Sequence, residues 1–356
     1  IEARVEEEIR TTLVEDAPKA GKIRKTAYNE ILGTTEWTLS NGVRVIVKPT
    51  EFKQDEILFY ATSLGGYSQV KTEDLPSALL ATDVVELAGL ADMNVTDLQK
   101  ALTGKRVSLS PSIGGNSESL SGSSTVKDLE TLLQLNYLYF TAPRRDEESY
   151  QTLMSILESQ LANRDKNPKV AFNDSIQMMT SNNSERTVIF TKKLLEKVSL
   201  DKALEVYKAR FANPADFTFF FVGNVNPEDS TFKAQVCQWL GGLKANKKKE
   251  KVVDHQVRVP LGKQQNYFTQ KMEIKTASNR IQYTSYNMPY TLANDLNMEM
   301  IGRILSTRYL ESIREREGGS YGVGCAGWMN IRPVPSAVLI MQFDTDPEKQ
   351  TKLMGI

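Results

Sequence analysis

The sequence predicts an α+β protein in which helices pack on one face of a largely antiparallel sheet. Two observations lead to this class. Runs of alternating apolar and polar residues lie next to turn residues, as in hairpins, and helices follow in pairs rather than as single crossovers between strands. The strand and helix order then restarts near residue 264, which predicts two modules of similar fold.

The N-terminal part contains a leader and a hairpin. Residues 1–13, IEARVEEEIRTTL, predict a charged helix, and we interpret residues 1–35 as a leader or linker. Residues 36–49, EWTLSNGVRVIVKP, predict two strands around Asn41-Gly42. This dipeptide favours a type I′ turn, in which both central residues have positive φ.

The first module continues with strands and helices whose ends carry recognisable signals. Pro76 fits the first turn of a helix that ends at Gly89, and Thr96 begins a capping-box sequence for a short helix ending near Gly104. We predict strands over residues 56–66, 106–114, 118–124 and 215–225, and helices over residues 125–143, 147–164, 199–211 and 227–240.

The module boundaries follow from composition. We place the first module at residues 36–243, a linker at 244–263, and a second module at 264–356 that is incomplete at its C-terminal end. The basic run KANKKKEK, residues 244–251, has no interleaved aromatic residues, which favours a solvated linker over an anion-binding site.

The second module repeats the pattern. Residues 280–290 predict a strand, and residues 292–317 predict a long helix with an apolar stripe through Ile301, Ile304, Leu305, Tyr309 and Ile313. Strands follow over residues 320–330 and 336–345. Asp346-Pro347 then begins a further helix, and we expect the chain to be part of a longer polypeptide.

The composition excludes several classes of function. The 44 basic residues balance the 44 acidic ones, so neither nucleic acid nor another polyanion is an expected partner. No apolar run reaches the roughly 18 residues of a membrane span. With His255 as the one histidine, a zinc site of two or three imidazoles cannot be built from this chain. Cys237 fits an apolar helix stripe better than a nucleophile, and Cys325 follows Tyr321 closely in a predicted strand.

The stretch IREREGGSYGV, residues 313–323, is the main candidate site. A helix ending at Gly318-Gly319 places Arg314 in its last turn and lets Tyr321 begin the next strand. A guanidinium fork and a neutral phenol could together hold a peptide backbone and stabilise an oxyanion. The residues alone also allow a helix-end arginine on a surface carboxylate and a tyrosine packed at a sheet edge.

The pattern R-x-x-E-x-x-x-Y formed by Arg314, Glu317 and Tyr321 resembles the arginine–tyrosine element of the pitrilysin/insulinase zinc metallopeptidases. LSNGVRVIVKP, KDLETLL and PADFTFFFVGNV extend the resemblance from about Glu36 to the C terminus. It is closest to the C-terminal half of bacterial members, which have four modules in two halves.

This resemblance implies a role for each part. Zn²⁺ would be held by an N-terminal half, either on the same chain or on a partner subunit. This chain itself would hold no zinc. Arg314 and Tyr321 would be the catalytic and substrate-binding residues. The substrate would be a peptide held in a closed chamber. The family's H-x-x-E-H motif falls near Leu80, Asp83 and Val84, two of which are aliphatic. We expect Asp83 and Glu86 to form the polar face of that helix.

Two alternatives remain open at this point. Some relatives have lost proteolysis, so the chain could be a scaffold, or a separate partner subunit of a zinc-bearing protein. The resemblance also implies export to the periplasm of a bacterium.

Overall fold

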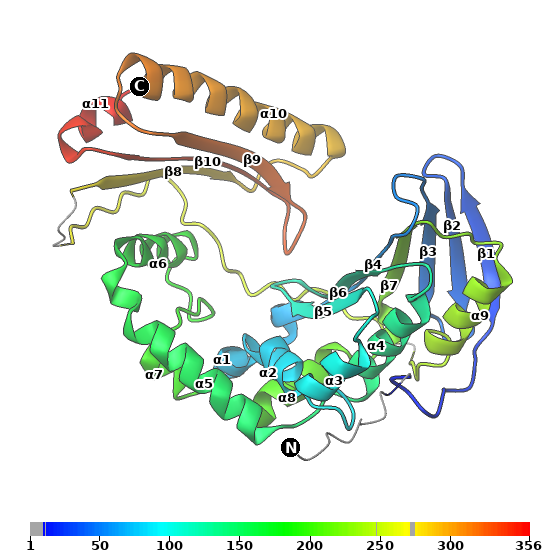
Figure 1. The fold of residues 1–356 in the computed structure, drawn as a ribbon. Helices are drawn as coiled ribbons and strands as arrows, with labels where there is room; N and C mark the ends of the chain where they lie inside the picture. The colour runs from blue at the N-terminus through cyan, green and yellow to red at the C-terminus, as the bar shows by residue number, and fades with distance from the viewer. Residues whose placement is uncertain (1–9, 11, 247, 271–274) are drawn as a thin grey trace, which may run out of the picture. The chain divides into compact units, whose positions relative to one another are not determined.

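The computed structural model describes residues 10, 12–246, 248–270 and 275–356 (Figure 1). Most of the helix predicted over residues 1–13 lies outside these residues. Contacts between residues divide the chain into two units, each considered separately below. The first unit comprises residues 1–162 and 190–253, and the second comprises residues 163–189 and 254–356. The second unit therefore includes a segment, residues 163–189, that the sequence places inside the first module.

The first unit contains a sheet of seven strands, and the predicted α+β class is confirmed. The strand order is β1-β2-β3-β7-β4-β6-β5. All neighbours are antiparallel except β3 and β7, which are parallel. The strands are β1 Ile23–Asn29, β2 Thr34–Leu39, β3 Arg44–Pro49, β4 Ile57–Leu64, β5 Val107–Ile113, β6 Ser117–Ser124 and β7 Thr218–Gly223.

The start of this sheet differs from the prediction in two ways. β1 lies within the predicted leader and pairs with β2, from Ile23 opposite Leu39 to Asn29 opposite Thr34. The predicted type I′ turn between β2 and β3 is wrong, because Gly42 has φ +88° and Asn41 is not among the residues with positive φ. The Asn41 side chain instead donates to the carbonyls of Leu240 (2.8 Å) and Leu243 (3.0 Å), which ties the turn to the end of the module.

Helices cover one face of the first sheet (Figure 1). The predicted helix from Pro76 is two helices, because Leu80 adopts φ −104° and ψ 4°. The predicted capping box is also displaced, since the side chain of Asn94, not Thr96, accepts from the Asp97 amide. The helices are α1 Leu75–Ala78, α2 Ala81–Ala88, α3 Val95–Ala101, α4 Leu129–Thr141, α5 Glu147–Ala162, α7 Lys192–Leu195, α8 Leu200–Arg210 and α9 Ser230–Trp239.

The core of the first unit lies between the sheet and these helices. Strand β7 is central, and its residues Phe219 and Phe221 are fully buried while Phe220 on the opposite face is half-buried. Phe219 and Phe221 flank Phe59 of β4 at ring distances of 6.1 and 5.2 Å. Period-2 alternation thus directs one face of each strand to the helices, as the aromatic run in the sequence predicts.

The second unit contains a smaller antiparallel sheet in the order β8-β10-β9. A helix, α6, that the sequence analysis missed also belongs to this unit. The elements are α6 Pro168–Thr180, β8 Ala277–Ser285, α10 Leu292–Tyr309, a π-helical turn Leu310–Arg316, β9 Val323–Asn330, β10 Ser336–Thr345 and α11 Gln350–Met354.

Helix α10 packs on this sheet through Gly302, and the predicted apolar stripe is buried only at its C-terminal end, where Ile313 is 2% exposed and Tyr309 packs beside it. Ile301 and Ile304 are 42% and 52% exposed. Gly302 is buried, and a Cβ there would lie 2.5 Å from the Gly327 nitrogen. A Cβ on Gly327 would in turn lie 2.1 Å from the Met298 carbonyl oxygen. The backbones of helix and strand therefore meet with no room for side chains between them.

The two units share an element order. In the first, β4 is followed by helices, then β5 and β6, and the strands lie in the order β4-β6-β5. In the second, β8 is followed by α10, then β9 and β10, and the order is β8-β10-β9. This agreement supports two modules of like fold, and the predicted module boundaries stay a prediction.

Candidate functional site

A glycine turn connects the end of the long helix to β9. Gly318 has φ +54°, a conformation that favours glycine. Its amide donates to the Arg314 carbonyl (3.0 Å), and the Gly319 amide donates to the Ile313 carbonyl (2.9 Å). The predicted helix end is therefore correct, and the last turns are π-helical. Such turns are frequent at functional sites.

Residues near the C-terminal end of the chain hold the turn in place. The Lys349 ammonium donates to the Gly318 carbonyl (3.2 Å), and the Thr345 hydroxyl donates to the Gly319 carbonyl. A Cβ on Gly319 would lie 2.5 Å from Cδ1 of Leu353. Leu353 belongs to a buried cluster with Ile313, Val323 and Phe343. The backbone on both sides of the turn is thus fixed by contacts that leave its outer side open.

Arg314 and Tyr321 lie on either side of this turn in the chain. The Arg314 side chain is exposed, and Tyr321 is 100% exposed. Glu317 pairs with Lys352 instead of with Arg314. Within the described part of the chain, neither Arg314 nor Tyr321 has a hydrogen-bond or ion-pair partner. The structure therefore does not support a surface ion pair for Arg314 or edge packing for Tyr321. Their convergence on one cavity stays a prediction.

The helix at the zinc-motif position has an apolar inner face. Leu80 and Val84 are 5% and 2% exposed and offer no ligand atom. Burial raises the pKa of Glu86, an effect that a hydrogen bond from Ser110 partly offsets. Asp83 is exposed, yet desolvation by the surrounding protein raises the pKa of its carboxyl too. These residues do not fit zinc. No group of three potential metal ligands occurs among the described residues.

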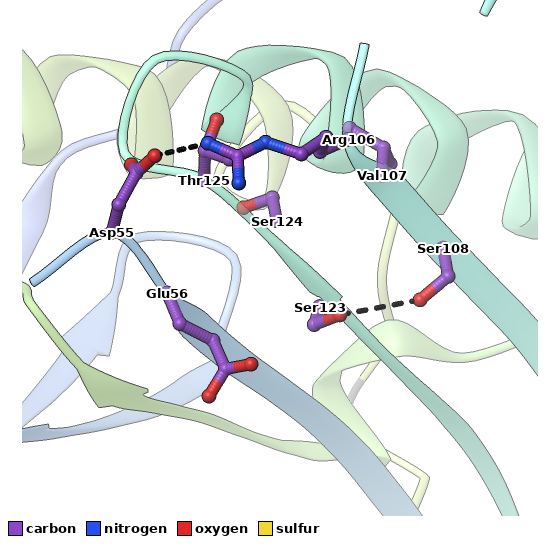
Figure 2. A pocket seen from close by; sticks show the side chains of 8 residues that line it. All are labelled: Asp55, Glu56, Arg106, Val107, Ser108, Ser123, Ser124 and Thr125. Atoms are coloured by element: carbon purple, nitrogen blue, oxygen red, sulfur yellow. Dashed lines mark hydrogen bonds and ion pairs between the residues drawn. The ribbon is translucent and has the colours of Figure 1, made fainter. Parts of the chain in front are cut away.

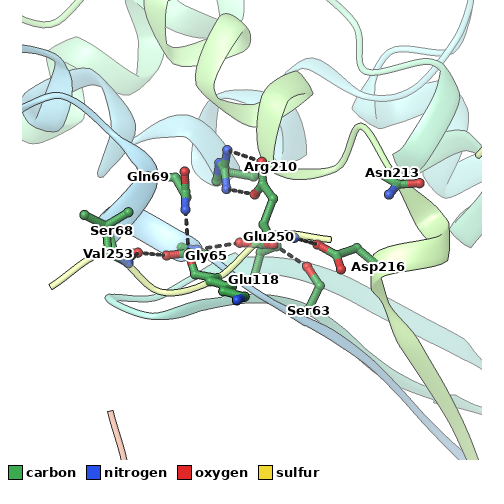
Figure 3. A network of polar contacts seen from close by, with 12 residues as sticks. Ser63, Gly65, Ser68, Gln69, Glu118, Arg210, Asn213, Asp216, Glu250 and Val253 are labelled. Carbon is green, nitrogen blue, oxygen red and sulfur yellow. Dashed lines mark hydrogen bonds and ion pairs between the residues drawn. The ribbon is translucent and has the colours of Figure 1, made fainter. Parts of the chain in front are cut away.

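A buried polar network lies at the C-terminal end of β4 (Figure 3). Glu118 is 1% exposed and accepts hydrogen bonds from the Ser63 hydroxyl and from the Gly66 amide (2.7 Å). Burial raises the pKa of Glu118, against the hydrogen bonds and the nearby Arg210 charge. Arg210, itself 8% exposed, pairs with Glu250 at 2.5 Å. Sequence reasoning missed this network, because its members lie far apart in the chain.

The network binds part of the predicted linker to the first unit. The Glu250 amide donates to Asp216 (2.9 Å), and the Val253 amide donates to the Ser68 hydroxyl (3.0 Å). The Asn213 carboxamide accepts from the Asn246 amide (3.0 Å) and donates to the Lys248 carbonyl (2.6 Å). The described residues from 246 to 253 are therefore not a freely solvated linker. Glutamate and backbone groups within the basic run make these contacts.

A shallow pocket of about 320 Å³ lies at the ends of β4, β5 and β6 (Figure 2). Arg106 crosses it and pairs with Asp55, and the hydroxyls of Ser108 and Ser123 are 3.3 Å apart. The remaining charged group at this pocket, Glu56, is also paired, with Lys53 outside the pocket at 2.8 Å. We therefore assign it no catalytic role.

The remaining candidates are not activated. Cys237 and Cys325 are free and half-buried, and burial raises the pKa of both thiols, which lowers the thiolate fraction. Cys325 packs against the cluster that supports the glycine turn. His255 is exposed. No helix among the described residues has the length and apolar character of a membrane span.

These observations define the class of the chain, namely an α+β protein with helices on one face of a largely antiparallel sheet and an apolar helix at the expected position of the zinc motif. Residues 197–354 match the family model described as the peptidase M16 inactive domain, and the predicted resemblance to the pitrilysin family is confirmed.

Three comparisons support this assignment. The chain is 24% identical over 99% of its length to the zinc protease PQQL-like of Arabidopsis thaliana. Its fold matches the crystal structure of the periplasmic protease PqqL from Escherichia coli (TM-score 0.82, 21% identity), covering 97% of this chain and 37% of that one. It also matches a peptidase M16 inactive domain from Pseudomonas fluorescens (TM-score 0.68, 15% identity), covering 90% and 77%. The chain spans about a third, 35%, of the length of the Arabidopsis relative.

Proposed function

We propose that this chain is the substrate-binding half of a zinc-dependent peptidase and that Arg314 and Tyr321 assist its transition state. The observation that carries the proposal is the anchored turn between these residues. It fixes the backbone on both sides while leaving the guanidinium and the phenol free to bind a ligand.

Each side chain has a distinct task in this proposal. The Arg314 guanidinium offers a planar set of N–H donors that orients a peptide carbonyl or carboxylate. The neutral Tyr321 phenol donates one hydrogen bond, which strengthens as negative charge develops on the carbonyl oxygen. Neither group activates water at neutral pH, so this chain binds and orients the peptide and the remaining chemistry lies elsewhere in the protein.

The rest of the protein supplies that chemistry. Zinc, which polarises a scissile carbonyl and acidifies a bound water when present, would be held by an N-terminal half on the same chain or on a partner subunit. The two halves would enclose an unfolded peptide in a chamber, and the second unit would be part of a second complete module. Relatives of this chain are named zinc proteases, and the name of one describes it as periplasmic, which supports the same location here.

The test is a Tyr321→Phe substitution in the full-length protein. Loss of one oxyanion donor costs roughly 2.7–4 kcal/mol, on the order of 10²–10³ in rate. The loss should fall on kcat more than on KM, because the hydrogen bond strengthens in the transition state. Arg314→Lys should also lower activity, since a point charge does not replace a planar fork. Because Tyr321 is fully exposed, the Tyr321→Phe substitution should leave the thermal stability of the protein unchanged. A parental kcat in Tyr321→Phe would contradict the proposal.

The second candidate is a scaffold or partner subunit without proteolysis. The aliphatic residues at the zinc-motif positions are compatible with it. An isolated full-length protein that hydrolyses no peptide, in the presence of zinc and of any zinc-bearing partner subunit, would favour it.

A further inference from the structure

Arg280 on β8 differs from five other buried or half-buried arginines. Those five have carboxylate partners within 3.1 Å and side chains that are 7–30% exposed: Arg10, Arg144, Arg164, Arg210 and Arg258. Arg280 is also half-buried, yet no carboxylate of the described residues pairs with it. Its Nε atom is buried and has no hydrogen-bond partner among those residues.

A charge in this position is costly unless something compensates it. Desolvation lowers the pKa of Arg280, and an arginine nevertheless remains protonated at neutral pH. Buried charges in proteins are normally paired, because water no longer stabilises them. The unpaired guanidinium therefore indicates a negatively charged partner that binds from outside the described residues.

The guanidinium is also held in place. Its terminal nitrogen donates to the Gln282 carboxamide oxygen (2.9 Å), and the Gln282 carboxamide nitrogen donates to the Thr284 hydroxyl (3.1 Å). The three residues alternate along β8 and so lie on one face of the strand. This chain of hydrogen bonds fixes one terminal nitrogen of the guanidinium and leaves the second terminal nitrogen for a ligand, while Nε is buried.

The surrounding residues neither neutralise nor block the site. Gln342 of β10 lies opposite Arg280 in the sheet register and brings a further amide donor to this part of the sheet. Asp344, on the same face of β10, is already engaged by Lys169 (2.5 Å) and by the Ser278 hydroxyl (2.7 Å). An incoming anion thus meets a fixed cation and neutral amides.

We propose that Arg280 is a binding site for a carboxylate group of the peptide substrate. The free terminal nitrogen can donate a charge-assisted hydrogen bond to a carboxylate oxygen. The carboxylate belongs either to the C terminus of the peptide or to an Asp or Glu side chain. This inference rests on the proposed function only in naming a peptide as the ligand.

Three fluorescein-labelled peptides test the proposal with the full-length protein. They share one uncharged, unstructured sequence and differ in the C terminus: one has a free carboxylate, one an amide, and one an amide with a single internal Glu. Fluorescence anisotropy gives the dissociation constants. We expect roughly tenfold tighter binding of one carboxylate-bearing peptide over the neutral amide, and the peptide that gains identifies which carboxylate is recognised.

Substitutions connect this difference to Arg280. Arg280→Met should abolish the preference without weakening binding of the neutral amide, and Arg280→Lys should restore only part of it. Arg303→Met is the matched control, because Arg303 is 79% exposed and pairs with Glu299 on a helix surface. It should leave the preference unchanged. Melting temperatures identify any variant that fails to fold.

Two results would overturn the inference. Equal binding of all three peptides by the parental protein would mean that Arg280 meets a carboxylate of the protein itself, and Arg280→Met would then also lower the melting temperature. A preference that survives in Arg280→Met would place the carboxylate site elsewhere. Both outcomes leave the role of Arg314 and Tyr321 intact, whereas failure of every peptide to bind would contradict the proposed function as well.

Discussion

The contact between α10 and β9 provides the sharpest test of how the second unit is held together. We consider the substitution Gly302→Ala, which adds one methyl group between the helix and the strand. That Cβ would lie 2.5 Å from the Gly327 nitrogen, 2.9 Å from the Ala326 carbonyl carbon and 3.0 Å from its Cα. All three neighbours are backbone atoms, so no side-chain rotation relieves the overlap.

The magnitude follows from two opposing effects. Overpacking a well-filled contact costs typically about 1–3 kcal/mol, and a backbone obstacle favours the upper end. Alanine gains about 1 kcal/mol over glycine in a helix interior. The net loss is therefore about 2 kcal/mol of unfolding free energy. The second unit should melt roughly 4–8 °C lower, as expected for a unit of this size.

Gly324→Ala is the matched control on the same strand. A Cβ there meets nothing within 4 Å, and the residue does not have positive φ. It should be neutral or stabilise by about 0.4–1 kcal/mol, because alanine restricts the unfolded chain. If close backbone approach holds α10 in place, differential scanning calorimetry should show a lower melting temperature for Gly302→Ala and an equal or higher one for Gly324→Ala. An unchanged or higher melting temperature for Gly302→Ala would refute the reasoning.

Two further predictions concern the buried network of the first unit. Burial raises the pKa of Glu118 in the folded state, so the folded protein retains this proton to higher pH than the unfolded chain. Stability should therefore fall as the pH rises from the unfolded pKa of about 4.3 through the raised folded value. In melting curves from pH 4 to 8, the Glu118→Gln variant should lack this part of the pH dependence. Equal slopes of melting temperature against pH in the variant and the parental protein would contradict the assignment. Arg210→Met leaves Glu250 without its partner and should cost about 3–5 kcal/mol. It should also speed trypsin cleavage after Lys248 and Lys249, measured by mass spectrometry, and an unchanged cleavage rate would show that the other hydrogen bonds suffice to hold the segment.

Local patterns in the sequence predicted most elements correctly. The alternation around Phe219 and Phe221 gave the central strand, because burial of one strand face has a period of two residues. Gly318 and Gly319 predicted the end of the long helix, since a left-handed turn there requires glycine. The motif of Arg314 and Tyr321 predicted the resemblance to the pitrilysin family, which the comparisons confirm. Elements without a local signal were missed, as with β1, whose burial is slight and whose pairing with β2 defines it.

The remaining features depend on residues that meet only in the folded chain. The sequence by itself determined the class of fold, the order of most strands and helices, and the resemblance to the pitrilysin family. The tertiary structure decided that the described residues from 248 to 253 are bound to the first unit, since Arg210 is 40 residues from its partner Glu250. It decided that Gly302, and not Ile301 or Ile304 of the predicted stripe, contacts the sheet, because that contact requires Gly327 opposite it. It also decided that Arg280 has no carboxylate partner among the described residues. Periodicity reports which face of an element is buried, whereas the partner on that face is set by long-range packing that no local pattern encodes.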